Sequence, residues 1–497
     1  MIFSQTWEII SRLAEYLCEY GRPAMKIIGR KKERMLLSQY RKSEAPEFVA
    51  VYGRRRVGKT FLINEVFREE YAFSAIGMLK ADKKEQLANF HAALKKYGGC
   101  AETPPGNWAE AFERLIALLE KSRKPGKKII FLDELPWFDT RKSGFISALE
   151  RFWNGWAASR PDILFIVCGS ATSWMIGNLI RNRGGLHNRV TRRMRIEPFT
   201  LAETEEYLVY KNILWGRREI AEAYMIFGGI PFYLNQLQPG MSLAQNVDAL
   251  CFEKDAFMRD EFFVLFASLF RNSRNHVKVL EVLGSCKTGM LRDDILTAAG
   301  LPSGGTSSVI LDELEQCGFI GKYNDYSGRH GRHVYQLTDF FTLFYLKQMK
   351  GNRQLGAGFW SKSLGKGRYN NWIGQTFEKL CLLHIDKIRE KLGISGIIAV
   401  PFAWKHGKTR DTEKGAQIDL LIDRNDGIIN ICECKFANGE FVIDREFAAQ
   451  LRERMDAFIR ATGTKKAGHL TMITTYGIRQ NKYSGIVQSE ATLDELF

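Results

Sequence analysis

One eight-residue segment constrains this chain more than any other. Residues 53–60 read Gly-Arg-Arg-Arg-Val-Gly-Lys-Thr and match the G-x-x-x-x-G-K-[ST] pattern in full. A short apolar run at 48–52 precedes the segment, and residues 61–67 continue with helical spacing. In this order of strand, loop and helix, the loop's backbone N–H groups can surround a phosphate, and the helix N-terminus adds its dipole. The segment therefore predicts a phosphate-binding loop in an α/β fold with a parallel sheet.

The pattern also predicts a role for each loop residue. Lys59 is expected to reach the β- and γ-phosphates of a nucleotide, and Thr60 is expected to ligate Mg²⁺. ATP and Mg²⁺ are thus the predicted cofactors. The predicted nucleotide contacts are Gly53, Arg54, Arg55, Arg56, Val57, Gly58, Lys59, Thr60 and Phe61.

Two further apolar runs end in polar residues. The run at 128–132 is followed by Asp133 and Glu134, and the run at 163–168 is followed by Gly169 and Ser170. Because parallel strands deliver their carboxyl ends to one edge of a sheet, these side chains are expected beside the phosphate loop. Asp133 is predicted to hold Mg²⁺ through water, and Glu134 to orient or deprotonate the attacking water. Ser170 either senses the γ-phosphate or caps the next helix.

These motifs together resemble those of the archaeal-type AAA ATPases, a group related to the STAND nucleotide switches. The resemblance rests on the motifs at 28–33, 53–60, 133–136, 169–170 and 227–231, and it covers nearly the whole chain. It implies that Gly29 and Arg30 border the adenine. It also implies that Pro231, in the Gly-Gly-x-Pro element, touches the base from a helical lid.

The family often has Pro-Leu-Tyr-Gly-Arg after the serine strand, where this chain has Gly-Leu-His-Asn-Arg at 185–189. Arg189 is therefore a weakened candidate for an arginine finger, which would act on a neighbour's γ-phosphate and imply a homo-oligomer. The alternative is that the arginines of this stretch bind a nucleic-acid backbone or stay solvated. The other arginines concerned are Arg181, Arg183, Arg192, Arg193 and Arg195.

Composition narrows the partners and the compartment. The chain has 497 residues and a formal net charge of +16, of which +12 lies in residues 1–240, and this excess favours polyanionic partners. No apolar run approaches about 18 residues, and the start of the chain lacks a signal-peptide pattern, so we expect a cytoplasmic protein without a membrane partner. Nine cysteines without a CxxC pair indicate reduced, mostly buried thiols.

The middle of the chain predicts a winged helix. Helices are expected at 277–283, 291–299 and 307–317, followed by strands at 319–323 and 333–337. The turn between the strands carries the basic cluster Arg329, His330, Arg332 and His333, whereas the third helix carries Asp312, Glu313 and Glu315, which repel phosphates. A DNA contact and a packing or protein contact both remain open. The aromatic residues at 340–345 are expected in the core.

The C-terminal region predicts a hairpin that carries acidic residues. A helix at 371–391 contains Glu378, and strands at 416–422 and 428–436 flank a turn at 423–427. If residue 422 pairs with 428, Glu433 is the diagonal neighbour of Asp419, about 7 Å away on the same face. Lys435 shares that face, and Cys432 and Cys434 point to the other.

This arrangement can support metal-dependent hydrolysis. Carboxylates on adjacent strands can bind Mg²⁺, and a neighbouring lysine can position or activate a water for attack on a phosphodiester. The pattern resembles the D…E-x-K constellation of restriction-endonuclease-like folds, and the ATPase family's C-terminal module is similar to PD-(D/E)XK nucleases. Ile418 stands where that motif has proline. The resemblance implies metal ligands at Glu378, Asp419 and Glu433, catalysis by Asp419, Glu433 and Lys435, and a lesser role for Gln450.

The predicted architecture is α/β throughout its two enzymatic parts. The expected order is an N-terminal extension at 1–25, a P-loop ATPase core at 26–200, a helical lid at 201–268, a winged helix at 269–350 and a nuclease-like domain at 351–497. Met25 could be the true start. Two functions remain open: an ATPase coupled to endonuclease cleavage of nucleic acid, DNA rather than RNA, or a nucleotide-controlled binding switch that does not cut.

Overall fold

The computed structural model describes residues 27–497, apart from 124, 182–183, 271, 288, 327–332, 353–355, 357 and 407–415. The predicted extension at 1–25, Arg183 and most of the basic turn at 329–333 lie outside the described residues. By internal contacts the chain forms two compact units. The first contains Gly58–Gly169 and Asn178–Arg195 together with the chain up to Tyr52, and the second contains Gly53–Val57, Ser170–Gly177 and Ile196–Phe497.

The first unit is built on a parallel sheet, as predicted. Its strand order is β2-β3-β4-β1-β5, and every pairing is parallel. The strands are β1 (Glu47–Tyr52), β2 (Tyr71–Ile76), β3 (Lys128–Asp133), β4 (Ile163–Gly169) and β5 (Arg192–Arg195). The three apolar runs of the sequence are thus β1, β3 and β4. Every residue of β3 and β4 is buried, as expected of strands covered on both faces.

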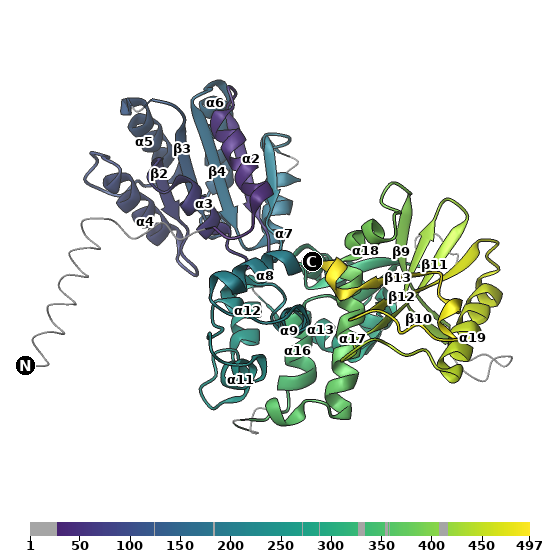
Figure 1. The fold of residues 1–497 in the computed structure, drawn as a ribbon. Helices are drawn as coiled ribbons and strands as arrows, with labels where there is room; N and C mark the ends of the chain where they lie inside the picture. The colour runs from purple at the N-terminus through teal and green to yellow at the C-terminus, as the bar shows by residue number, and fades with distance from the viewer. Residues whose placement is uncertain are drawn as a thin grey trace, which may run out of the picture. The chain divides into compact units, whose positions relative to one another are not determined.

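Helices pack against this sheet (Figure 1). They are α2 (Lys31–Lys42), α3 (Lys59–Phe67), α4 (Lys83–Lys96), α5 (Trp108–Lys121) and α6 (Phe145–Gly155), with short η1 (Leu135–Trp137) and η2 (Ala157–Ser159). Asp82 and Glu85 form a capping box that fixes the start of α4. An aromatic cluster fills the space between helices and sheet, and in it Phe48 of β1 lies 4.8 Å from both Trp153 and Phe165, measured between ring centroids.

The second unit begins with helices. They are α7 (Thr172–Trp174), α8 (Leu201–Tyr210), α9 (Arg217–Phe227), α10 (Pro231–Leu234), α11 (Leu243–Val247), η4 (Asp248–Phe252) and α12 (Glu261–Leu269), and η3 (Met175–Ile180) follows α7. The next segment has α13 (Arg274–Ser285), β6 (Met290–Leu291), α14 (Arg292–Ala298), α15 (Gly305–Gln316), β7 (Ile320–Asp325) and β8 (His333–Leu337). The three helices and two strands expected here are therefore present. The next helices are α16 (Phe340–Phe344) and η5 (Tyr345–Met349), and the aromatic residues at 340–345 are buried as predicted.

A mixed sheet of eight strands completes the second unit, in the order β13-β12-β11-β10-β9-β7-β8-β6. Its remaining strands are β9 (Ala399–His406), β10 (Ala416–Arg424), β11 (Ile428–Lys435), β12 (Ala467–Thr474) and β13 (Ser489–Thr492). β7 pairs with β9 in parallel, so the hairpin of the middle segment continues into the C-terminal sheet. The helices of this part are α17 (Gly367–Leu383), α18 (Ile385–Lys391) and α19 (Arg445–Thr462), with short η6 (Ser361–Ser363), η7 (Ser484–Ile486) and η8 (Leu493–Leu496).

The C-terminal helix differs from its prediction. The sequence indicated one helix over 371–391, but the chain leaves helical geometry at His384 and forms α17 and α18. The ring of His384 is buried, lies 3.0 Å from the carbonyl of Leu380 and meets the ring of Tyr224 edge to face. Helical periodicity in the sequence does not reveal such tertiary contacts, so the break at His384 was not predicted.

Two expectations of composition can be checked in the described residues. None of the helices there is long and apolar enough to cross a bilayer. All eight described cysteines are free thiols, and only Cys100 among them is exposed.

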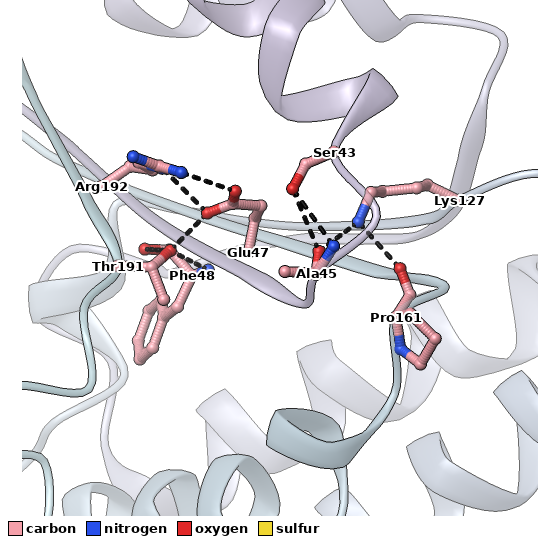
Figure 2. A network of polar contacts seen from close by, with 8 residues as sticks. All are labelled: Ser43, Ala45, Glu47, Phe48, Lys127, Pro161, Thr191 and Arg192. Atoms are coloured by element: carbon pink, nitrogen blue, oxygen red, sulfur yellow. Dashed lines mark hydrogen bonds and ion pairs between the residues drawn. The ribbon is translucent and has the colours of Figure 1, made fainter.

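A polar network anchors the amino end of β1, the end opposite the phosphate loop (Figure 2). Arg192 donates to both carboxylate oxygens of Glu47 at 3.1 Å, and Thr191 donates to Oε2 at 2.6 Å. Lys127 donates to the carbonyls of Ala45 and Pro161 at 2.6 and 2.8 Å. Burial alone would raise the pKa of Glu47, but the hydrogen bonds from Arg192 and Thr191 outweigh it and lower the pKa.

We predict that Glu47→Gln loosens β1 and β5 in a pH-dependent way. Because the folded pKa of Glu47 lies below that of an unfolded glutamate, about 4.3, its stabilisation is present above that pH and is lost as the pH falls through the folded pKa. The variant should lose about 1–3 kcal/mol of local stability at pH 7. Hydrogen–deuterium exchange of β1 and β5 amides measures this. Glu44→Gln, at an exposed neighbouring position, is the control, and an equal loss at pH 7 and pH 4 contradicts the assignment.

Candidate functional site

The phosphate loop has the predicted order of strand, loop and helix. β1 ends at Tyr52, and α3 begins at Lys59 directly after Gly58, which has a positive φ of 88°. Gly53 has a φ of 140°, and a Cβ atom there would lie 2.3 Å from the carbonyl oxygen of Ile196. Both glycines are therefore required by the backbone, as the motif demands.

Thr60 and Asp133 meet at the carboxyl end of the first unit's sheet. Thr60 Oγ1 donates to Asp133 Oδ2 at 2.9 Å, and Lys59 is buried with 6% of its surface exposed. Burial, followed by the charge of Glu134, raises the pKa of Asp133. The hydroxyl and carboxylate oxygens are the hard ligands that Mg²⁺ prefers, so these two residues fit the predicted metal.

Cys168 belongs to the same group, although the sequence gave no reason to name it. It lies in β4, and its thiol contacts the carboxyl group of Asp133. Burial and the charge of Asp133 raise the pKa of this thiol well above its usual value, while Lys59 lowers it. The protonated, uncharged thiol is therefore favoured at this position beside the charged groups. Its place at the end of an apolar strand was the signal that could have found it.

Glu134 has a strained backbone. Its φ is 47°, in the left-handed region that non-glycine residues rarely adopt, and its N–H donates to Asp133 Oδ1 at 2.9 Å. Among the described residues, seven other than glycine have positive φ, and three of them are predicted nucleotide-site residues: Arg30, Arg56 and Glu134. Such strain is concentrated at functional sites, where the surrounding structure over-determines it.

The loop arginines make contacts that the motif does not predict. Arg54 is buried, forms an ion pair with Asp339, and lies over the ring of Phe319 at 4.9 Å. Burial alone would lower its pKa, but Asp339 outweighs this and raises the pKa of the guanidinium. Arg56 forms an ion pair with Glu261 and lies 4.4 Å from the ring centroid of Phe232. Both side chains are thus held within the second unit.

The other predicted nucleotide contacts occupy varied environments. Gly29 and Arg30 are buried and precede α2, where Arg30 is the N-cap residue. Arg55 is half-buried, and Phe61 is 38% exposed at the start of α3. Val57 is buried.

Ser170 and Pro231 lie in the second unit. Ser170 is buried, and the N-cap of the following α7 is Ala171 rather than the serine, so Ser170 is not the helix cap. Pro231 opens α10. Before it, Gly229 has a φ of 63° and a carbonyl that accepts from the N–H of Phe199 at 2.8 Å.

Arg189 is exposed on the first unit, in the turn before β5. Its exposure is compatible with both interpretations from the sequence, an arginine finger and a solvated or phosphate-binding side chain.

The C-terminal hairpin differs from its predicted register by two residues. Ile422 pairs with Asn430 rather than with 428, and Leu420 pairs with Cys432. The predicted pairing was wrong because β10 runs on to Arg424, which forms an ion pair with Asp426 across the turn. The next positions beyond Leu420 and Cys432 are Asp419 and Glu433. β10 has a bulge between Ile418 and Leu421 in its pairing with β9, so strict alternation does not extend through Asp419, and the closeness of the two carboxylates is instead shown by their electrostatic interaction.

The carboxylates lie close together, with Glu433 buried and Asp419 half-buried. Asp419 Oδ2 accepts from the N–H of Cys434 at 3.1 Å, and Lys435 Nζ donates to Glu433 Oε1 at 2.6 Å. Burial and the charge of Glu433 raise the pKa of Asp419. Burial, with Asp419 and Glu433, likewise raises the pKa of Glu378 on α17. The three predicted metal ligands are thus brought close enough to repel one another.

Arg454 is a member of this cluster that sequence reasoning missed. From α19 it contacts Glu433 Oε2 at 2.5 Å, so Glu433 lies between two cations. Gln450, which the sequence favoured, donates to Glu446 of its own helix at 3.2 Å instead. Arg454 lies one helical turn beyond Gln450 on α19. The i, i+4 spacing from Gln450 was the sequence signal that could have identified it.

The residues of the cluster fit a magnesium ion. Among the described residues, no three carboxylate, imidazole or thiol groups converge closely enough to form a complete metal cage. Mg²⁺ does not need one, because it commonly binds through one or two carboxylates and keeps several waters. Burial alone would lower the pKa of Lys435, but Glu433 outweighs this and raises the pKa, so the charged form of this lysine is favoured.

Several known proteins are similar to this chain. An uncharacterized protein of Methanocaldococcus jannaschii, MJECL04, is 24% identical over 406 residues, which cover 79% of this chain and 83% of that protein. A Walker-type ATPase of Pyrococcus abyssi matches 65% of this chain and 96% of its own, with 17% identity and a TM-score of 0.44. A STAND protein with a tetratricopeptide repeat sensor, from Pyrococcus horikoshii, matches 75% of this chain and 53% of its own, with 17% identity and a TM-score of 0.30.

A family model identifies the N-terminal part. Residues 28–237 match ATPase_2, described as an ATPase domain predominantly from Archaea. The matched range contains the phosphate loop, the Thr60–Asp133 pair and Glu134. The predicted archaeal-type ATPase is thereby confirmed for this part of the chain. The protein is a P-loop ATPase, an enzyme that hydrolyses ATP.

Proposed function

We propose that this ATPase acts on DNA and couples ATP hydrolysis to metal-dependent phosphodiester cleavage by its C-terminal region. The observation that carries the proposal is the cluster of Asp419, Glu433 and Lys435 on adjacent strands, with Glu378 beside it. Because desolvation and neighbouring carboxylates raise the pKa values of Asp419 and Glu378, the site gains from a bound cation.

At the nucleotide site, each residue has a distinct task. Lys59 neutralises the β- and γ-phosphates, while Thr60 and Asp133 hold Mg²⁺, Asp133 through water. Glu134 orients the attacking water. Gly29 and Arg30 border the base, Pro231 contacts it, and Ser170 senses the γ-phosphate. Arg189 reaches the γ-phosphate of a second copy, which makes a homo-oligomer part of the proposal.

At the carboxylate cluster, Asp419 and Glu433 hold Mg²⁺ with Glu378 in support. The metal supplies Lewis-acid polarisation of the scissile phosphate. Lys435, already bonded to Glu433, orients the attacking water. The segment at 274–337, with its three helices and hairpin, is a winged helix in this proposal. Its α15 presents Glu313 to His276 at 2.8 Å, which favours packing over DNA contact for this helix.

A specific observation favours a second candidate. Glu433 is bonded by both Lys435 and Arg454, so two protein cations already neutralise the carboxylate that should bind a metal. A domain of this kind could bind nucleic acid without cutting it, and ATP hydrolysis would then only reset its conformation. Cleavage distinguishes the two candidates.

For the nucleotide site we predict different losses from two variants. Lys59→Ala should abolish ATP turnover because the phosphate charge loses its counter-ion. Glu134→Gln should keep ATP binding but lower kcat about 10²–10⁴-fold, the usual contribution of a positioned base. Steady-state phosphate release and binding of a fluorescent ATP analogue measure the two effects. Lys84→Ala, at an exposed position of α4, is the matched lysine control. Normal turnover by Glu134→Gln would contradict the role of Glu134.

For the carboxylate cluster we predict that Asp419→Ala abolishes Mg²⁺- or Mn²⁺-dependent cleavage while ATP turnover survives. Asp423→Ala is the matched control, because Asp423 lies on the same strand but is paired with Lys466. Plasmid, linear and single-stranded DNA, with and without ATP, are the substrates. Cleavage that persists in Asp419→Ala would exclude this site, and no cleavage by the unmodified chain would favour the binding switch.

A further inference from the structure

A basic groove lies along one face of α17, within the second unit. It consists of two adjoining hollows of about 410 and 300 Å³, which share Gln348 and Arg368 as lining residues. The cations of the first hollow are Lys287, Lys347, Arg368 and Lys379, and the second adds Lys362 and Lys366.

The groove carries an excess of positive charge. No aspartate or glutamate is among the described residues that line either hollow. In the described part of the chain, no carboxylate lies within ion-pair distance of Lys287, Lys347 or Lys379. Burial lowers the pKa of Lys347, and the charge of Lys287 lowers it further. A bound anion would relieve this repulsion.

The amides beside the cations add hydrogen-bond donors. Asn371 and Gln375 line the first hollow between Arg368 and Lys379, and Trp372 contributes an aromatic wall. Positions 368, 371, 375 and 379 recur at helical spacing and so share one face of α17. Positively charged and amide side chains in alternation are suited to phosphate oxygens rather than to a carboxylate or an apolar ligand.

The length of the groove distinguishes a polymer from a small ligand. At 1.5 Å per residue, Arg368 and Lys379 are about 16 Å apart along the helix axis. One strand of B-form DNA carries about five phosphates over that length. An isolated phosphate or a mononucleotide would leave most of these cations unpaired.

We propose that this groove binds the sugar–phosphate backbone of a nucleic acid. Its role as a track for substrate rests on the proposed function, because α17 also carries Glu378 of the carboxylate cluster. A strand in the groove therefore lies against the same helix that supports the cutting site. The binding itself depends only on the groove.

Binding is tested with the full chain and a fluorescein-labelled 20-base-pair duplex in EDTA, where metal-dependent cleavage cannot occur. The double variant Lys287→Gln/Lys347→Gln should bind at least about tenfold more weakly and lower the salt dependence, log K against log[salt], by about 2. Lys287 is exposed and Lys347 is half-buried, so replacing them should not threaten the fold, and circular dichroism melting verifies this. Lys465→Gln, an exposed lysine after α19, is the control and should bind normally.

Each outcome decides the proposal. Weaker binding with a reduced salt slope supports it, and Lys362→Gln/Lys366→Gln should then add a further loss. Unchanged duplex affinity in both double variants would overturn the proposal that this groove binds nucleic acid. Cleavage by the unmodified chain would still support the proposed function in that case. Quenching of tryptophan fluorescence by inorganic phosphate that is lost in Lys287→Gln/Lys347→Gln, without duplex binding, would assign the groove to a small phosphorylated ligand and overturn the proposal. If a double variant lost cleavage but bound the duplex normally, the substitutions would have affected the carboxylate cluster instead of the groove, and the proposal would be overturned.

Discussion

The phosphate loop is held by two buried ion pairs, and the behaviour of the nucleotide site depends on them. Arg54 pairs with Asp339 and Arg56 with Glu261, and all four side chains are buried or nearly so. Asp339 also caps α16, accepting from the N–H of Thr342, and Glu261 accepts from the hydroxyl of Tyr233 at 2.6 Å. Removing one member of such a pair leaves a buried charge and costs about 3–5 kcal/mol. The loop therefore cannot move freely: a nucleotide that shifts its backbone must carry α12 and α16 with it or break these pairs.

Sequence reasoning succeeded where the chemistry is local. The glycine-rich loop, the strands that deliver Asp133 and Ser170, and the three helices and hairpin of the middle segment could all be predicted, because periodicity and turn residues are properties of a few neighbours. Sequence reasoning failed where contacts between distant residues determine the structure. The helix break at His384 accompanies its ring contact with Tyr224, and Arg54 forms an ion pair with Asp339, which is 285 positions away in the sequence. Rules based on local spacing cannot predict such pairs.

The carboxylate cluster shows both sides of this limit. The hairpin register was wrong, and a bulge interrupts β10 between Ile418 and Leu421, yet Asp419 still lies close enough to Glu433 for that charge, besides burial, to raise its pKa. The approach of the two carboxylates could therefore be predicted from the hairpin. The charge balance could not. Arg454 reaches Glu433 from one helix and the half-buried Glu378 comes from another, so the number of cations and anions at the site depends on packing.

That charge balance bears on how the cluster could be controlled. Asp419, Glu378 and Glu433 face Lys435 and Arg454, so a metal ion entering the site competes with two protein cations for Glu433. Next to Glu378 on α17, Lys379 has its pKa lowered to about 8 by burial, and the charge of Glu378 acts in the opposite direction. A polyanion in the groove would favour the charged form of that lysine and so alter the field at Glu378 from one position away. The helix thus places the two charged regions so close in sequence that filling one must change the electrostatics of the other.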